Sequence, residues 1–241
     1  MATVLQHPVF EGTATDHIYP LLERTSVRAY VPGETVSSPG LGAPCLYLVL
    51  SGYVQLFDLS ADGQRVIYDL AGPGGIAGFL GVVGLQPAFI ESLTHSRLAT
   101  LSESVSHALM DAEQRVLMNL LATVGKMLER RQAHLARLAL RQPTERLAAE
   151  LLALAETSAG GGSTTVSIPR LSHQALGDML GLRRETVTLH LARLRVAGAL
   201  DVAGHEFLLN LGRLAEVCDG GMPGGAVAER GQPGPTAAAG D

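Results

Sequence analysis

The segment Ser172–Leu200, SHQALGDMLGLRRETVTLHLARLRVAGAL, predicts two short helices joined by a tight turn. Ser172 is a suitable N-cap for the first helix, because its hydroxyl can accept a hydrogen bond from a free backbone N–H of the first turn. Gly181 supplies the left-handed residue that often ends a helix. The first helix carries one apolar stripe at helical spacing, made of Ala175, Leu176, Met179 and Leu180. The segment therefore predicts a helix-turn-helix.

The second helix of this pair has a polar face near its N-terminus. Its buried side combines apolar residues at spacings of four and three, namely Val187, Leu191 and Leu194. Arg184, Glu185 and Thr188 then lie on the opposite face, where a recognition helix meets base edges in a major groove. Arg can bind guanine with two hydrogen bonds, and Glu can accept one from cytosine. This pattern predicts DNA binding; a simple helical hairpin is the alternative.

A small β-hairpin is predicted directly after the second helix. Gly198 closes the helix, and the short runs Ala199–Val202 and His205–Leu209 flank a turn at Ala203-Gly204. A helix-turn-helix followed by such a hairpin is a winged helix. A winged helix that contacts only proteins is the alternative to one that binds DNA.

This part of the chain resembles the DNA-binding domain of the CRP/FNR family of bacterial transcription regulators. The family's recognition helix has an R-E-T-V core, which is Arg184-Glu185-Thr186-Val187 here. Gln142–Glu156 resembles the first helix of that domain, and the similarity extends from about Val9 to Val217. The resemblance implies a homodimer that places two recognition helices in successive major grooves of a pseudo-palindromic operator, about 34–36 Å apart.

The resemblance also assigns the expected DNA contacts. Arg184 and Glu185 would read bases, whereas Arg183 and Thr186 would hold phosphate groups. Gln174, on the preceding helix, would add a phosphate contact. Leu189 stands where cyclic-AMP-binding members have a second Arg, so the implied half-site is related to TGTGA but relaxed at that position, where Leu189 can contact a thymine methyl. The candidate DNA-binding residues are Gln174, Arg183, Arg184, Glu185, Thr186, Thr188 and Leu189.

The distribution of charge matters more than its sum. The net charge is −5, but it is unevenly distributed. Residues 1–110 hold four Arg and nine acidic residues, whereas residues 111–218 hold thirteen Lys or Arg and eleven acidic residues. A local cluster of arginines can therefore still engage phosphate. It consists of Arg183, Arg184, Arg193 and Arg195.

Other features of composition point to a cytoplasmic protein. No apolar run approaches the roughly 18 residues of a membrane span, and the N-terminus lacks the basic and apolar regions of a secretory signal. Cys45 and Cys218 lie far apart, so we expect no disulfide between them, and two cysteines cannot hold an iron–sulfur cluster.

Short β-type runs separated by Gly and Pro occupy residues 27–103, a pattern typical of a sandwich or barrel. Asp62-Gly63 predicts a hairpin between Tyr53–Leu59 and Arg65–Leu70. The order YVPGE…LYLVLSGYVQL resembles the β-roll of cyclic-nucleotide-binding domains, a jelly-roll-like double-stranded β-helix. A generic β-sandwich is the alternative.

A long helix is predicted from about Asp111 to Leu140. The residues of one face, mostly apolar, follow one another at alternating spacings of four and three, as in the seam of a two-stranded coiled coil. The expected dimer interface is Leu117, Leu121, Val124, Leu128, Arg131, Leu135 and Leu138. A helix packed only on its own β-domain would show the same periodicity.

The expected fold is thus α+β, with a β-roll over residues 1–110, a central dimerisation helix over 111–141 and a winged helix-turn-helix over 142–218. Gln142-Pro143 predicts a hinge, because Pro suits the first helical position and Glu145 can cap backward. Ser158–Thr165 is expected to be a flexible loop, and residues 219–241, rich in Gly, Ala and Pro, a disordered tail.

The effector pocket departs from the pattern of cyclic-AMP-binding members, which place a Glu after a Gly for the ribose and an Arg about ten residues later for the phosphate. Here the run is Gly78, Phe79 and Leu80, so Phe79 replaces the Glu, and Leu85–Leu93 contains no Arg. The Thr-Ser pair that reads adenine corresponds to Arg131-Gln132. We therefore expect no cyclic AMP binding and no cofactor.

Several alternatives stay open for this pocket. Phe79 could fill it, or another small molecule could occupy it with Arg131 meeting an anionic group. Haem could bind through one of the available histidines, His7, His17, His95, His107 or His134. Cys45 could sense redox state only if it were exposed with a lowered pKa.

No catalytic pattern is visible in the sequence: there is no Ser/His/Asp order, paired-carboxylate site or metal-spaced set of Cys and His. We therefore expect a regulator and not an enzyme. If it is an activator, RNA polymerase is an additional partner.

Overall fold

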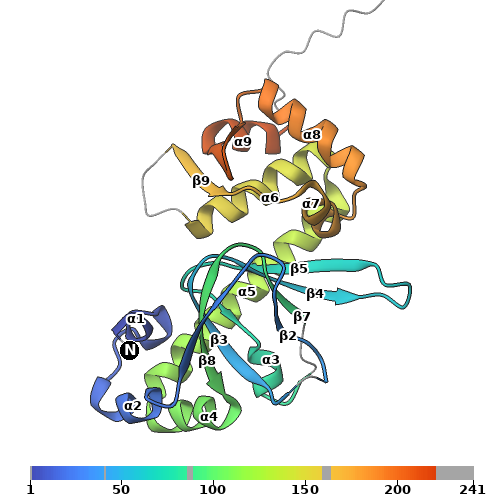
Figure 1. Ribbon diagram of the computed structural model, residues 1–241. Coiled ribbons are helices and arrows are strands. Elements are labelled where there is room, and N and C mark those ends of the chain that lie inside the picture. Colours follow the sequence, from blue (N-terminus) through green and yellow to red (C-terminus); the bar gives the residue numbers. More distant parts are fainter. Residues whose placement is uncertain (1, 41, 86–88, 159–163, 221–241) are drawn as a thin grey trace, which may run out of the picture.

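The computed structural model describes residues 2–40, 42–85, 89–158 and 164–220 (Figure 1). An N-terminal β-domain is joined by one long helix to a smaller C-terminal domain. Residues 221–241, where the disordered tail was expected, lie outside the described residues, as do residues 159–163 of the expected loop. No helix within the described ranges has the length and apolar character needed to cross a membrane.

The N-terminal domain is a β-roll of two antiparallel four-stranded sheets, as predicted. One sheet has the order β1-β8-β3-β6, formed by Ser26–Tyr30, Ser96–Ser102, Cys45–Ser51 and Ile76–Ala77. The other has the order β2-β7-β4-β5, formed by Thr35–Ser37, Phe89–Ser92, Val54–Leu59 and Arg65–Ala71. The helical elements of this domain are α1 (Ala2–Leu5), the 3-10 turn η1 (Pro8–Phe10), α2 (Thr15–Leu22), α3 (Phe79–Val82) and α4 (Glu103–Ala112).

Strand β3 is buried on both faces, which explains its nearly continuous apolar sequence. Leu46 and Leu48 belong to a core cluster shared with the helices around the roll. Tyr47 and Val49 belong to a second cluster, together with residues of the other sheet. Because side chains alternate along a strand, one short segment contributes to two layers of packing.

Two turns match the local sequence signals. The hairpin β4–β5 forms where it was predicted, with Gly63 in the left-handed region (φ 77°). Gly52, between β3 and β4, also has a positive φ of 76°, and a Cβ there would collide with the carbonyl oxygen of His95. Only Gly fits such a position without strain.

The long helix α5 spans Gln114–Leu140 and begins three residues after the expected start. The difference arises because α4, which was not predicted, occupies the preceding residues. Ser102 caps α4 by accepting a hydrogen bond from the backbone N–H of Val105. Glu113 is extended, ends α4, and caps α5 by accepting from the N–H of Arg115.

The C-terminal domain is a winged helix-turn-helix, as predicted. Its helices are α6 (Pro143–Ser158), α7 (His173–Leu180), α8 (Arg184–Val196) and α9 (Leu211–Cys218). Its sheet has the order β10-β11-β9, formed by Leu200–Ala203, Glu206–Asn210 and Thr165–Pro169. The wing turn lies at Gly204-His205, one residue later than expected, because Ala203 pairs with Glu206.

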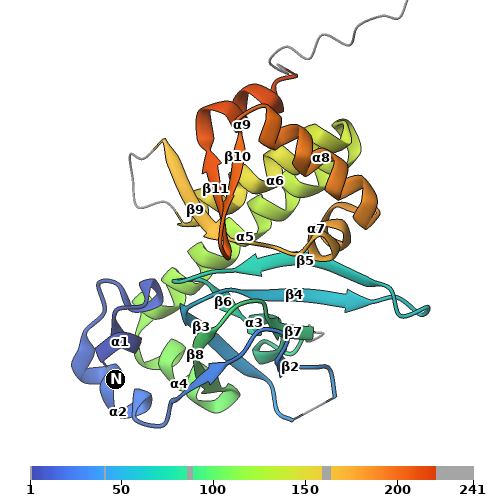
Figure 2. The ribbon, with the colours of Figure 1, turned by 45° about the horizontal axis from the view of Figure 1, so that its top comes forward.

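The two domains share packing next to α5. Phe57, Ile67 and Leu70 of the β4–β5 hairpin belong to the same buried cluster as Leu154 of α6 and Met179 of α7. Figure 2 shows β5 running beneath α7. The C-terminal domain therefore packs on the β-roll as well as being joined to it by the long helix.

Candidate nucleic-acid interface and the cavity of the β-roll

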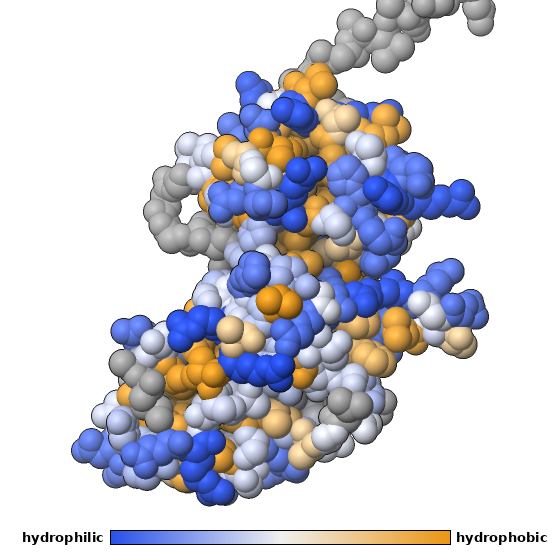
Figure 3. Space-filling view, in the orientation of Figure 1, coloured by the Kyte–Doolittle hydropathy of each residue, from blue (hydrophilic) through white to orange (hydrophobic). Residues whose placement is uncertain are grey.

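Helix α8 presents the predicted polar face from a buried scaffold. Val187 and Leu194 are completely buried, and Leu191 is nearly so. On the outer face, the candidate residues Arg183, Arg184, Glu185, Thr188 and Leu189 are exposed, and Thr186 is half-buried. Hydrophilic side chains gather over the end of α8 that lies next to α7 (Figure 3). These side chains are free to meet the edge of a duplex.

The turn between α7 and α8 depends on two glycines. Gly181 has the predicted left-handed conformation, with φ 63°, and its N–H bonds to the carbonyl of Gly177. Gly177 lies in the middle of α7, and a Cβ there would be 2.6 Å from the carbonyl oxygen of Leu182. The backbone of the turn thus packs directly on α7, which fixes the start of the recognition helix.

His173, which was not among the predicted site residues, contacts the recognition helix. Its Nδ1 lies 2.7 Å from Oγ1 of Thr188. The Thr188 hydroxyl donates to the carbonyl of Arg184 at 2.9 Å, so Thr188 accepts from a protonated Nδ1. Burial lowers the pKa of His173, and the nearby charges of Arg170 and Arg184 lower it further.

The sequence offered no local signal for this contact, because it depends on the angle at which the two helices meet. Gln174, the predicted phosphate contact on α7, is exposed, and its Nε2 donates to Asp178 of the same helix at 2.7 Å. His173, Gln174 and the outer face of α8 therefore form one polar surface.

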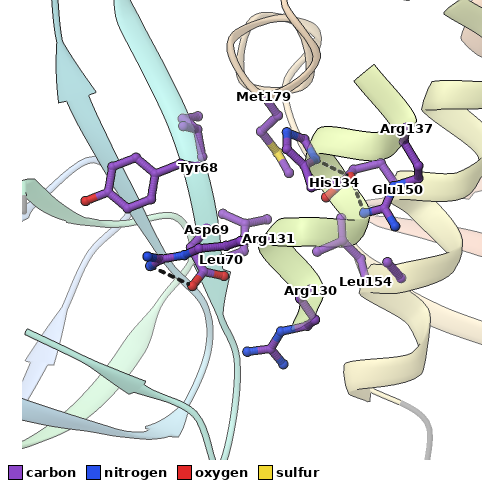
Figure 4. A pocket seen from close by; sticks show the side chains of 12 residues that line it. Tyr68, Asp69, Leu70, Arg130, Arg131, His134, Arg137, Glu150, Leu154 and Met179 are labelled. Atoms are coloured by element: carbon purple, nitrogen blue, oxygen red, sulfur yellow. Dashed lines mark hydrogen bonds and ion pairs between the residues drawn. The ribbon is translucent and has the colours of Figure 1, made fainter. Parts of the chain in front are cut away.

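A buried carboxylate joins α5 to the C-terminal domain (Figure 4). Oε2 of Glu150 on α6 lies 2.8 Å from Nδ1 of His134 and accepts from Arg137 at 3.1 Å. Burial alone would raise the pKa of Glu150, but the hydrogen bond and charge of His134 and the charge of Arg137 together lower it. Glu150 is thus held as an anion by two side chains of α5.

A second ion pair joins α5 to β5. Arg131 donates from Nη2 to Oδ2 of Asp69 at 3.2 Å, and its guanidinium carbon lies 5.0 Å from the centre of the Tyr68 ring. Burial raises the pKa of Asp69, although Arg131 and Arg130 act in the opposite direction. Arg131 therefore contacts the β-roll of its own chain at this point of the predicted seam.

The other seam positions divide into two groups. Leu121, Leu128 and Leu135 are 51, 57 and 65% exposed, at intervals of seven residues. Leu117, Val124 and Leu138 are half-buried against their own chain. One row of large apolar side chains is consequently left open to solvent along α5.

A cavity of about 200 Å³ lies in the β-roll, between α3, β5 and α5. Gly78, Phe79, Leu80 and Arg131, four of the five predicted effector-pocket residues, line it. Gln132 is instead exposed on α5. Gly78 starts α3 with φ 78°, and a Cβ there would collide with the carbonyl oxygen of Cys45, so α3 lies close against β3.

Two of the histidines named as possible haem ligands have ordinary structural partners. His7 is buried and bonds to the carbonyl of Gly75, and His107 bonds to the carbonyl of Val82. Within the described ranges, no three His, Cys, Asp or Glu side chains come together as metal ligands. Burial raises the pKa of the Cys45 thiol, the opposite of the shift expected for a redox sensor. His17 and His95 are exposed.

The exposed polar helix edge on a winged helix-turn-helix, joined by a long helix to a β-roll, defines a two-domain regulator that binds DNA. Residues 145–217 match the Crp-like helix-turn-helix domain, and residues 27–113 match the cyclic nucleotide-binding domain.

Individual relatives cover nearly the same span. The nitrogen fixation regulation protein FixK of Rhizobium meliloti is 32% identical over 195 residues, which cover 77% of this chain and 86% of that protein. The CRP-like cAMP-activated global transcriptional regulator of Mycobacterium tuberculosis is 24% identical, over 84% of this chain and 92% of its own. The structure of FixK2 from Bradyrhizobium japonicum superposes with a TM-score of 0.68 at 25% identity, covering 80% of this chain and 96% of that one.

The chain belongs to the CRP/FNR family of transcription regulators. The predicted class is thereby confirmed: the protein is a DNA-binding regulator and not an enzyme.

Proposed function

We propose that the protein is a homodimer that binds a pseudo-palindromic operator with half-sites related to TGTGA, and that it does so without cyclic AMP. The observation that carries this proposal is the exposure of Arg184 and Glu185 on a helix whose inner face is buried. Base-reading side chains need both a rigid scaffold and a free outer face.

The polar edge of α8 supports a specific division of contacts. Arg184 and Glu185 read one G·C pair or two adjacent steps that contain G·C pairs, through guanine O6 and N7 and cytosine N4. Arg183, Thr186 and Gln174 hold phosphate groups and set the position of the helix in the groove. Leu189, 52% exposed, offers an apolar contact where an Arg would read a further base.

The open row on α5 supports the dimer. Leu121, Leu128 and Leu135 repeat every seven residues, and a second copy of α5 would cover them in a coiled coil. Burying a Leu side chain contributes about 1.5–3 kcal/mol before entropy costs. Two-fold symmetry would then present two recognition helices to two half-sites.

The walls of the β-roll cavity support independence from cyclic AMP. Arg131 is the single cationic side chain among the described lining residues, and it is already paired with Asp69. A cyclic phosphate would therefore meet a neutralised cation and, close behind it, a carboxylate. Phe79 has no atom that can accept a hydrogen bond from a ribose hydroxyl. The residues present do not fit a cyclic nucleotide.

As a DNA-binding regulator the protein would act in the cytoplasm. If it activates transcription, its second macromolecular partner is RNA polymerase.

Selection from a pool of random duplexes with the full chain tests this proposal. We expect enrichment of two inverted half-sites centred about 10–10.5 base pairs apart, or a multiple of that spacing. Cyclic AMP should leave the affinity for the selected duplex unchanged within twofold. A pool without any enriched motif, a single unpaired half-site, or binding that requires cyclic AMP would each contradict a part of the proposal.

A further inference from the structure

A second heptad row on α5 lies open to solvent beside the three exposed leucines. It falls one residue later than the half-buried row of the predicted seam, and it consists of Met118, Gly125, Gln132 and Ala139, all exposed. Together with Leu121, Leu128 and Leu135, these residues alternate at spacings of three and four along the helix. This is the a and d pattern of a two-stranded coiled coil, with Leu at every d position.

The seven residues form a face that suits a second copy of the chain. Met118 and the three leucines are each more than half exposed, so four large apolar side chains lie on one side of one helix. None of the seven residues carries a charge, and two identical faces therefore do not repel each other. The chain's own β-roll already covers another side of α5, where Val116 and Leu120 are buried.

Gln132 is the one polar residue among these seven. Its side chain makes no hydrogen bond within the part of the chain that the structure describes. Leu128 and Leu135 lie one turn before and one turn after it on the same face. In a dimer these leucines would exclude water from the Gln132 amide, and a buried amide without a hydrogen bond is unfavourable.

We propose that Gln132 pairs with Gln132 of the second copy, and that this pair fixes the register of the two α5 helices and selects an identical chain as partner. In a parallel, in-register pair each a position faces its own counterpart. Each amide has donors and an acceptor, so the two can hydrogen-bond reciprocally. The inference rests on the proposed function, because it assigns a role inside the proposed homodimer.

Other arrangements leave the amide without a partner. A shift by one heptad places Gln132 opposite Gly125 or Ala139, and an antiparallel pair places it opposite a Leu. None of these side chains can form a hydrogen bond with it. A single polar residue at an a position specifies register in this way, at some cost in stability. The same penalty acts against a different chain that has an apolar residue at this position.

The register of α5 matters for the recognition helices. His134 and Arg137 bind Glu150 of α6, so the DNA-binding domain is held to the same helix. A shift by one heptad moves one helix along the other by about 10 Å. Such a shift would displace one recognition helix relative to the other and break the two-fold symmetry of the pair.

The test mixes the full wild-type chain with a mass-tagged Gln132→Leu variant and counts dimers by native mass spectrometry after subunit exchange. We expect Gln132→Leu to form homodimers at least as stable as those of the wild type, because an apolar residue replaces a polar one in the seam. The mixed dimer, with one amide facing a Leu, should be depleted. A tenfold lower exchange constant reduces it from the statistical half to about a quarter of all dimers.

Two further variants serve as controls. Met118→Leu exchanges one apolar residue for another in the same exposed row, and its mixture with the wild type should contain the statistical half of mixed dimers. Gln132→Asn keeps an amide at the position, so its mixed dimer with the wild type should be more abundant than that of Gln132→Leu. Because both residues are exposed in the single chain, neither substitution disturbs the core.

Three outcomes would overturn the inference alone: statistical mixing of Gln132→Leu, equal depletion for Met118→Leu, or equal depletion for Gln132→Asn. Binding of the wild type to its selected duplex is measured in parallel. A wild-type dimer that binds this duplex and yet mixes statistically with Gln132→Leu leaves the proposed function intact. A wild-type chain that forms no dimer overturns the inference and the proposed function together.

Discussion

His134 Nδ1 lies 2.8 Å from Oε2 of Glu150. This contact joins α5 to α6 across Arg141 and Gln142, the two residues between the helices. Arg137, one turn further along α5, donates to the same oxygen at 3.1 Å. A single buried carboxylate thus fixes the start of the DNA-binding domain to the central helix. We therefore expect the orientation of α6 to depend on the ionised form of this carboxylate.

The first prediction concerns the stability of this junction. Removing one partner of a buried ion pair leaves the others without compensation and costs about 3–5 kcal/mol. We expect Glu150→Gln to lower the free energy of unfolding by about this amount at pH 7, measured by denaturant unfolding. The matched control is Glu216→Gln, which removes an exposed 2.9 Å pair with Arg213 and should change stability by less than about 1 kcal/mol.

The same pair gives a pH dependence. The pKa of Glu150 is lowered from its usual 4.5, so its contribution to stability is fully present above pH 4.5 and is lost as the pH falls through the folded-state pKa. Unfolding free energies below pH 4.5 should therefore fall less steeply for Glu150→Gln than for the wild type. Parallel curves would show that Glu150 does not contribute.

The second prediction concerns Gly177. Replacing Gly by Ala inside a helix usually stabilises by about 0.5–1 kcal/mol. At Gly177, however, the new Cβ would lie 2.6 Å from the carbonyl oxygen of Leu182, so the turn before α8 must move. We expect Gly177→Ala to destabilise by about 1–3 kcal/mol, as overpacked sites do.

Gly125 on α5 provides the control for this substitution, because a Cβ there meets nothing within 4 Å. Gly125→Ala should raise the melting temperature while Gly177→Ala lowers it. If both substitutions move the melting temperature in the same direction, close packing of the turn on α7 is not the cause.

These glycines illustrate which features of the fold can be predicted from sequence. The cap at Ser172 and the left-handed Gly181 have local causes, and both were predicted. The close approach at Gly177 depends on how the turn folds back on α7, and no pattern of neighbouring residues encodes that. Helices α4 and α9 were missed although they are no shorter than α7, because each follows directly on a strand, β8 or β11, which masked where the helix begins.

The candidate site shows the same division. Exposure of Arg184 and Glu185 followed from helical periodicity. The contacts of His173 with Thr188 and of Arg131 with Asp69 join residues from different elements, and periodicity cannot distinguish a partner helix from the protein's own β-roll. The predicted seam therefore included a residue that contacts β5.

The third prediction tests the open row on α5. A Glu at position 121 would bring two carboxylates together in the proposed dimer and remove two apolar contacts. We expect Leu121→Glu to weaken dimerisation by about 3–6 kcal/mol for the two symmetric copies, from about 1.5–3 kcal/mol per Leu. Analytical ultracentrifugation measures this change.

Ala122→Glu is the control, because Ala122 is exposed on α5 and outside the predicted seam. It adds the same charge and should leave the dimer intact. Dissociation of both variants, or of neither, would mean that the seam is not the interface.

The fourth prediction concerns base reading by Arg184. Arg184→Ala should cost about 1–3 kcal/mol of binding to the selected operator and relax specificity at one base position. Gel-shift titrations against operators with each base changed in turn measure both effects. Arg193, in the last turn of α8, provides a control cation: Arg193→Ala should leave the base preference unchanged. A uniform loss on all duplexes for Arg184→Ala would make Arg184 a phosphate contact only.

The fifth prediction follows from the effect of the Arg184 charge on the pKa of His173. Burial is the largest cause of the lowered pKa of His173, and the charges of Arg170 and Arg184 add to it. Arg184→Ala removes one of these charges and leaves the burial, so the pKa of His173 should rise part of the way toward its usual 6.5. NMR titration of the imidazole measures this shift.

Because its folded-state pKa is lowered, His173 is neutral at pH 7, and its Nδ1–H remains available to Thr188. Acidification should protonate the ring and reduce stability as the pH falls below 6.5. Arg213→Ala, which removes a cation on α9, serves as the control and should leave the titration of His173 unchanged. An unchanged pKa in Arg184→Ala would show that the guanidinium points away from His173, and the polar surface of α7 and α8 would then be two separate parts.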